Sequence, residues 1–240
     1  MQKERMKTTQ GFSLVELSIV MVVIGLIVGG VLAGREIIRN AEVNSVAAEL
    51  AAIETGIFTF ESKYNLLPGD LNIATTYWPA VTANGDGNGF VDDDFGIRED
   101  LLAWQHMALA GVMRGNYTGV ADPAFPPSGI NPGVNAPTSK IIASSFTLQR
   151  HIPPVDDYNG VYGQFVRFAG QTPTGTLMKP LLNPSEAKRI DAKTDDGNSE
   201  TGDIIGYNGT GGSGNCTTAG NYNVANNGPS CCLHWWTKYQ

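Results

Sequence analysis

The run Asn84-Gly-Asp-Gly-Asn-Gly-Phe-Val-Asp contains the residue types of a metal-binding loop. Asn84, Asp86 and Asn88 alternate, the next glycine permits a sharp turn, Phe90 offers a backbone carbonyl and Asp92 stands at the ninth position. Hard cations such as Ca²⁺ take several oxygen ligands from a tightly turned backbone. The run therefore predicts a calcium loop formed by Asn84, Asp86, Asn88, Phe90 and Asp92.

The twelfth position of this loop departs from the calcium pattern. It is Phe95, whereas a calcium loop of the EF-hand type has a bidentate Glu there. Asp93, Asp94 or Glu99 can supply that carboxylate instead. The alternative is a solvated loop rich in Asn, Gly and Asp, which is common in exported proteins.

The three cysteines, Cys216, Cys231 and Cys232, all lie near the C-terminus. In an oxidising compartment they predict one disulfide, from Cys216 to either Cys231 or Cys232. The loop that it closes has about fifteen residues, which contributes about 3 kcal/mol in the chain-entropy model. Together with His234 the cysteines also have a spacing that can bind zinc, which is the second interpretation.

A single charge, Glu16, lies inside a long apolar segment near the N-terminus. Eighteen residues from Leu17 to Gly34 carry no charge, and Arg35 follows them. At about 1.5 Å per residue in a helix, this segment is just long enough to cross the hydrocarbon core of a membrane. A carboxylate inside such a helix costs on the order of 3 kcal/mol, so we expect Glu16 to have a partner.

The apolar segment is not typical of a cleaved secretory signal. It is too long, and no Ala-x-Ala-like cleavage site follows it. A plain membrane anchor explains its length. It explains neither Glu16 nor the small residue Gly11 between Gln10 and Phe12 at the front of the segment.

The run Gly11-Phe-Ser-Leu-Val-Glu-Leu17 resembles the N-terminus of type IV pilins and of the pseudopilins of type II secretion. The resemblance implies that a prepilin peptidase cuts between Gly11 and Phe12 and methylates the new amine of Phe12. It also implies that Glu16 pairs with the Phe12 amine of a neighbouring subunit during assembly. One departure is that many pilins carry a proline late in this segment, where this chain has Gly29, Gly30 and Gly34.

The resemblance also implies partners and a location. The partners are the prepilin peptidase, other pilin or pseudopilin subunits, an inner-membrane assembly platform and membrane lipid. The location is the bacterial inner membrane, with one span and a cytoplasmic N-terminus, followed by a periplasmic or cell-surface filament. The basic leader residues Lys3, Arg5 and Lys7 agree with that orientation. The formal net charge of −7 argues against a nucleic-acid-binding face.

The elements around these residues form an α+β chain in this interpretation. We divide it into a leader (1–11), a transmembrane or filament-core helix (12–34), an amphipathic stem (35–64) and an exported domain (65–240). One helix is predicted over 13–64, because apolar residues recur at steps of three and four until Pro68-Gly69-Asp70 breaks the pattern. The alternative is two helices broken at Gly34. The pilin resemblance implies that the long helix packs on a small antiparallel sheet with long loops.

Within the exported domain the pattern predicts helices over 98–112 and 183–193, strands over 141–148 and 161–168, and a final strand from Leu233. Residues 115–137 and 197–230 read as loops. His106 has no nucleophile nearby, so we interpret it as structural. The acidic group Asp191, Asp195 and Asp196 is interpreted as a solvated helix end.

The function predicted from the sequence is that of a filament subunit. We expect a minor pilin, because the exported domain is large and rich in loops. The alternatives are a type II secretion pseudopilin or a tip-located binding or adhesion protein with a calcium-stabilised loop. An enzyme is not expected, because the chain has no nucleophile elbow, no zinc-protease motif and no phosphate-binding loop.

Overall fold

The computed structural model describes residues 11–79, 83–92, 96–151, 163–173 and 176–237. The helices are α1 (Leu14–Tyr64), α2 (Ala74–Tyr77), α3 (Glu99–Leu109) and α4 (Pro184–Thr194). The strands are β1 (Ser144–His151), β2 (Gly163–Gln171), β3 (Leu177–Lys179), β4 (Ile204–Asn208), β5 (Thr217–Thr218), β6 (Asn221–Tyr222) and β7 (Cys231–Trp236). The chain divides into two compact units, Met1–Ala41 and Glu42–Gln240, which are described separately.

The predicted single helix is confirmed, because α1 continues through Gly34 without a break. In the first unit, all residues from Gly11 to Ala33 are exposed. By its length and composition α1 is able to cross a membrane. In the second unit, α1 buries one face, which is the face that the apolar periodicity predicts. The buried apolar residues of that face are Val43, Val46, Ala47, Leu50, Ile53, Ile57 and Phe60.

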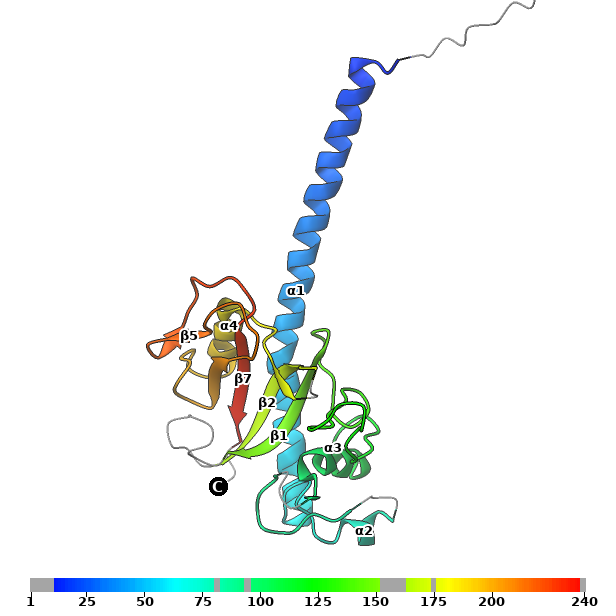
Figure 1. Cartoon of the computed structure of the whole chain (residues 1–240), viewed down its shortest axis with the longest axis vertical. Coiled ribbons are helices and arrows are strands. Elements are labelled where there is room, and N and C mark those ends of the chain that lie inside the picture. Colours follow the sequence, from blue (N-terminus) through cyan, green and yellow to red (C-terminus); the bar gives the residue numbers. More distant parts are fainter. Residues whose placement is uncertain (1–10, 80–82, 93–95, 152–162, 174–175, 238–240) are drawn as a thin grey trace, which may run out of the picture. The chain divides into compact units, whose positions relative to one another are not determined.

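The predicted α+β architecture is confirmed in the second unit. Its main sheet is antiparallel with the strand order β1-β2-β7-β4 (Figure 1). The short strand β3 pairs with the C-terminal end of β2, at Gly170 and Gln171. The C-terminal strand β7 is therefore central, between β2 and β4. Val166, Phe168 and Leu233 from these strands join the buried face of α1 in one hydrophobic core.

Several strand assignments differ from the prediction, including the end of β2 at Gln171 and the start of β7 at Cys231. β1 begins at Ser144 rather than at Ile141, because Ala143 adopts a left-handed backbone and the Ser144 N–H donates to the Ile141 carbonyl. The segment 197–230, predicted as loop, contains β4 and the hairpin β5-β6. β4 forms because Ile204 and Tyr207 are buried against the sheet and its backbone pairs with β7.

Candidate functional site

The start of α1 is closed by a reciprocal pair of hydrogen bonds between Ser13 and Glu16. The backbone N–H of Glu16 donates to Ser13 Oγ at 3.2 Å, and the backbone N–H of Ser13 donates to Glu16 Oε2 at 2.8 Å. This is a capping box, and it satisfies two amides that the first turn leaves without partners. The sequence prediction named Glu16 but missed Ser13, although the Ser-x-x-Glu spacing was visible.

The predicted processing residues lie immediately before this cap. Gly11 and Phe12 precede the first helical residue, and 88 % of the Phe12 side chain is exposed. The bond between them lies outside the helix, between two exposed residues. An amine formed at Phe12 would lie one residue from the capping box.

The second unit has its own group of functional residues, which begins at the turn after α1. Gly69 has a φ of +97°, and its N–H donates to Nδ1 of the buried His106 in α3 at 3.0 Å. The His106 ring stacks on Phe60, near the C-terminal end of α1, and lies close to Trp78. It therefore links the turn to the end of α1. Burial lowers the pKa of His106 to about 4, so the ring is neutral where its Nδ1 accepts the bond from Gly69.

The segment Asn84–Asp92 wraps around Asp70, the residue that follows this turn. The Gly85 N–H donates to the Leu71 carbonyl at 3.1 Å, and the Gly89 N–H donates to Asp70 Oδ2 at 3.0 Å. Gly85 lies so close to the turn that a Cβ atom there would be 2.3 Å from the Gly69 carbonyl oxygen. Only glycine fits this contact.

Glu99, the first residue of α3, holds both ends of the same segment. Its Oε1 accepts a hydrogen bond from the Asp86 N–H at 2.8 Å, and its Oε2 accepts one from the Asp92 N–H at 3.3 Å. The Glu99 N–H in turn donates to the Asp92 carbonyl at 3.1 Å. Only 1 % of Glu99 is exposed, so the loop covers this carboxylate.

These contacts bring three carboxylates together. One oxygen from each of Asp70, Asp86 and Glu99 lies within 4.8 Å of the other two. Asp70 is fully buried, and its Oδ1 has no hydrogen-bond partner. Burial raises the pKa of Asp70 to about 6 and that of Glu99 to about 7, although backbone amides partly oppose the shift. Oxygen ligands of this kind suit a hard divalent cation.

The structure brings only Asp86 of the five predicted calcium ligands into this group of carboxylates. Asn84 Oδ1 accepts a hydrogen bond from the Thr75 N–H, and Asn88 Oδ1 accepts one from the Phe90 N–H, both at 2.8 Å. The Asn84 side chain therefore ties the loop to α2, and the Asn88 side chain stabilises a turn within the loop.

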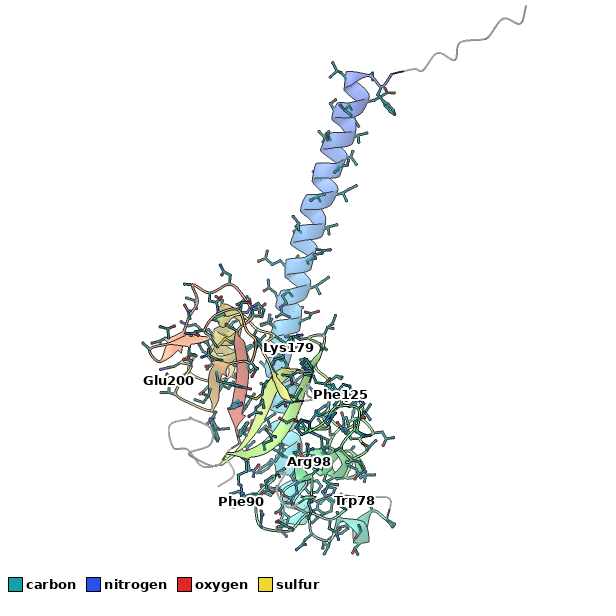
Figure 2. All side chains as sticks on the ribbon, in the orientation of Figure 1. Trp78, Phe90, Arg98, Phe125, Lys179 and Glu200 are labelled. Carbon is teal, nitrogen blue, oxygen red and sulfur yellow. A yellow bond between two sulfur atoms is a disulfide. The ribbon has the colours of Figure 1, made fainter. Side chains whose placement is uncertain are left out.

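The other two predicted ligands contact Arg150. Asp92 forms an ion pair with Arg150 at 3.2 Å, and the guanidinium lies over the Phe90 ring. Figure 2 labels Phe90 in this loop and Arg98, which precedes α3. Of the three alternative carboxylates, Glu99 joins the group, whereas Asp93 and Asp94 lie outside the described residues.

Sequence reasoning missed Asp70 as a member of this group. It was interpreted only as part of the turn that ends α1, and no local spacing connects it with a loop that begins at Asn84. The fold makes the connection, because α3 holds the turn through His106 and the loop through Glu99.

The cysteines form one of the two pairings that the sequence left open. A disulfide joins Cys216 to Cys231, and Cys232 is free and buried. The Cys232 thiol donates to the Met178 carbonyl at 3.5 Å, and burial raises its pKa to about 12. The zinc interpretation does not hold, because two of its three sulfur ligands are in the disulfide and the third stays protonated.

The second acidic group is only in part the solvated helix end that the sequence predicted, since Asp196 is exposed but Asp191 and Asp195 are not. Asp191 is fully buried, and it accepts hydrogen bonds from the Tyr222 hydroxyl at 2.8 Å and the Gly197 N–H at 2.9 Å. Asp195 accepts the amides of Asp203 and Ile204, the latter at 3.0 Å. These carboxylates fasten the end of α4 to the following loop and to β6.

Comparison with known proteins identifies the N-terminal segment. A family model described as the prokaryotic N-terminal methylation motif matches residues 6–32. No curated protein and no solved structure matches the chain. The matched range includes the Gly11–Phe12 bond, the capping box of Ser13 and Glu16, and most of the apolar half of α1. The chain therefore carries a prokaryotic N-terminal methylation motif of the kind found on prepilins, within its first 32 residues.

Proposed function

We propose that this chain is a structural subunit of a type IV pilus-like filament and, because its exported domain is rich in loops, a minor pilin. The observation that carries the proposal is the methylation motif over residues 6–32 at the start of a continuous 51-residue helix. The first part of that helix is apolar and exposed. A segment that first lies in lipid and later packs against other subunits needs such a surface.

The proposal assigns the leader to residues 1–11, the filament-core helix to 12–34, the stem to 35–64 and the exported domain to 65–240. A prepilin peptidase cuts after Gly11 and methylates the Phe12 amine. The chain then leaves the inner membrane through an assembly platform and joins other pilin subunits. The exposure of Gly11 and Phe12 ahead of the helix supports this processing step.

Assembly gives Glu16 a second partner. In the single chain, its carboxylate accepts hydrogen bonds from the N–H and the hydroxyl of Ser13, both at 2.8 Å. In the filament, the Phe12 amine of a neighbouring subunit lies beside this carboxylate. The cationic amine then neutralises a charge that is costly among apolar helices.

The exported domain supports a minor role rather than a major one. The segment between α3 and β1 and the segment between β4 and β7 have long stretches without regular structure. A subunit that forms most of a filament needs less surface of this kind. The alternative assignment, a pseudopilin of type II secretion, shares the same motif and the same processing.

The test is the mass of the N-terminal peptide from protein recovered in membrane and in sheared cell-surface fractions. A chain that begins at methylated Phe12 supports the proposal, and its presence in sheared material favours a pilus over a periplasmic pseudopilus. Substitution Gly11→Val should block cleavage, whereas the matched control Gln10→Ala should leave it intact. A chain that still begins at Met1 in cells with an active peptidase would overturn the proposal.

A further inference from the structure

We propose that Asp70, Asp86 and Glu99 bind a Ca²⁺ ion that fastens the 84–92 loop to the end of the stem helix. All three residues belong to the second compact unit, so the site lies within one unit. This inference does not rest on the proposed filament function. It also replaces the ligand set that the loop sequence predicted, since only Asp86 is common to both sets.

The first observation is that one carboxylate of the group carries a buried oxygen without a hydrogen-bond partner. Asp70 has no exposed surface, and its Oδ1 has no hydrogen-bond partner. A buried carboxylate oxygen without a donor is costly, and folded proteins rarely leave one in that state. The Asp70 carboxylate belongs to the group whose oxygens lie within 4.8 Å of one another. A cation at this position would supply the partner that the protein does not.

The second observation is that the other two carboxylates keep free lone pairs. Glu99 accepts one N–H at each oxygen, from Asp86 and from Asp92. Asp86 accepts the backbone N–H and the side-chain amide of Asn88, both at 2.9 Å. Because each carboxylate oxygen can accept at more than one position, these bonds orient the oxygens and still leave them able to bind a metal.

The backbone supports this arrangement without help from the metal. Gly87 and Gly89 have φ values of +77° and +87°, which turn the loop sharply over Asp70. A Cβ atom at Gly87 would lie 2.6 Å from the side chain of Asn72, so the loop is also close to the chain that follows Asp70. The three carboxylates are thus held in place by backbone contacts from both sides.

The chemistry of the group selects Ca²⁺ among common cations. All three side chains offer oxygen, whereas zinc in proteins prefers sulfur and nitrogen. Mg²⁺ keeps several of its waters, but Asp70 and Glu99 are 0 % and 1 % exposed and leave little room for a hydrated ion. Ca²⁺ accepts irregular geometry and several carboxylates, so it fits two buried carboxylates joined by the exposed Asp86.

The experiment uses the full chain in detergent, stripped of metal with a chelator and then titrated with CaCl₂ or MgCl₂. Calorimetry gives stoichiometry and affinity, and thermal unfolding gives the change in Tm. We expect one Ca²⁺ per chain, a rise in Tm with Ca²⁺ and a smaller rise with the same concentration of Mg²⁺.

The deciding variant is Asp70→Asn, which keeps the shape of the side chain and removes its charge. Since it removes a buried carboxylate without a full set of partners, it should fold in chelator with a Tm at least equal to that of the parent chain. Its affinity for Ca²⁺ should fall by at least about tenfold, with a matching loss of the Tm rise.

Two control variants make the result specific. Asp191→Asn also alters a buried aspartate, but in the second acidic group, so it should retain the Ca²⁺ effect. Asp92 is one of the ligands that the loop sequence predicted, but it forms an ion pair with Arg150 instead. The variant Asp92→Asn should therefore retain the Ca²⁺ effect as well. The proposal is overturned if Ca²⁺ does not bind the parent chain, if Asp70→Asn binds it equally well, or if Asp92→Asn abolishes binding while Asp70→Asn does not.

Discussion

Gly69 packs directly on the backbone of Glu99. A Cβ atom at Gly69 would lie 2.4 Å from the Glu99 carbonyl oxygen, which is closer than real Cβ atoms come to backbone atoms. The φ of Gly69 is +97°, and its N–H is bound to His106. The turn after the stem and the start of α3 are therefore in contact through backbone atoms, which places Asp70 beside Glu99.

Substitution Gly69→Ala should destabilise the domain by about 3 kcal/mol or more, because it combines a left-handed backbone with a clash that neither backbone can avoid. Gly111→Ala is the matched control. Gly111 also has a positive φ, +74°, but nothing lies within 4 Å of a Cβ atom there. It should cost only about 1 kcal/mol. Denaturant unfolding of both variants measures the difference, and equal losses would contradict the role of the contact.

The long-range part of this site explains what the sequence could and could not predict. The stem helix and α3 follow from apolar residues at helical spacing, and α4 follows from Asn183 and Pro184 at its start, where a capping box is present. These signals are local. Asp70 and Glu99 meet because Gly69 fits against α3, and no local pattern records that contact.

The same reasoning explains the missed strands. β4 and the hairpin β5-β6 lie in a segment rich in Gly and Asn, where apolar periodicity is weak. Ile204 and Tyr207 gain their burial from β7, which lies further along the chain. Asp191 was misinterpreted for a similar reason, since its partner Tyr222 comes from β6.

The capping box predicts a specific effect at the start of α1. Substitution Ser13→Ala removes the acceptor for the Glu16 N–H and should weaken the first turn by about 1 kcal/mol. Amide hydrogen exchange in detergent should therefore speed up by about fivefold in the first turn. The control Ser18→Ala removes only a bond to the Val15 carbonyl within the helix and should leave this exchange unchanged. Equal exchange in the parent chain and Ser13→Ala would show that the box does not hold the turn.

The disulfide predicts a response to reductant that depends on which cysteine is changed. Cys216 and Cys231 are 15 residues apart, so reduction should lower the free energy of unfolding by about 3 kcal/mol. Cys216→Ser should lose stability and no longer respond to reductant. Cys232→Ser should keep the response, because Cys232 is the free thiol. Urea unfolding with and without dithiothreitol measures both, and a response retained in Cys216→Ser would mean that another pair forms.

Asp191 should make stability depend on pH in a defined window. Burial, with a smaller contribution from Asp195 and Asp196, raises the pKa of Asp191 from 3.8 to about 6, although the bonds from Tyr222 and Gly197 oppose the shift. Below about pH 4 the carboxyl is protonated in both the folded and the unfolded chain, so it contributes no difference. Between about pH 4 and 6 the unfolded chain ionises first, and the folded state loses stability as the pH rises, by on the order of 2 to 3 kcal/mol. In Asp191→Asn this loss is absent. The stability of the parent chain minus that of the variant should therefore fall across the window and be constant above it, and a difference that stays flat from pH 4 to 7 would show that the folded chain holds Asp191 ionised throughout.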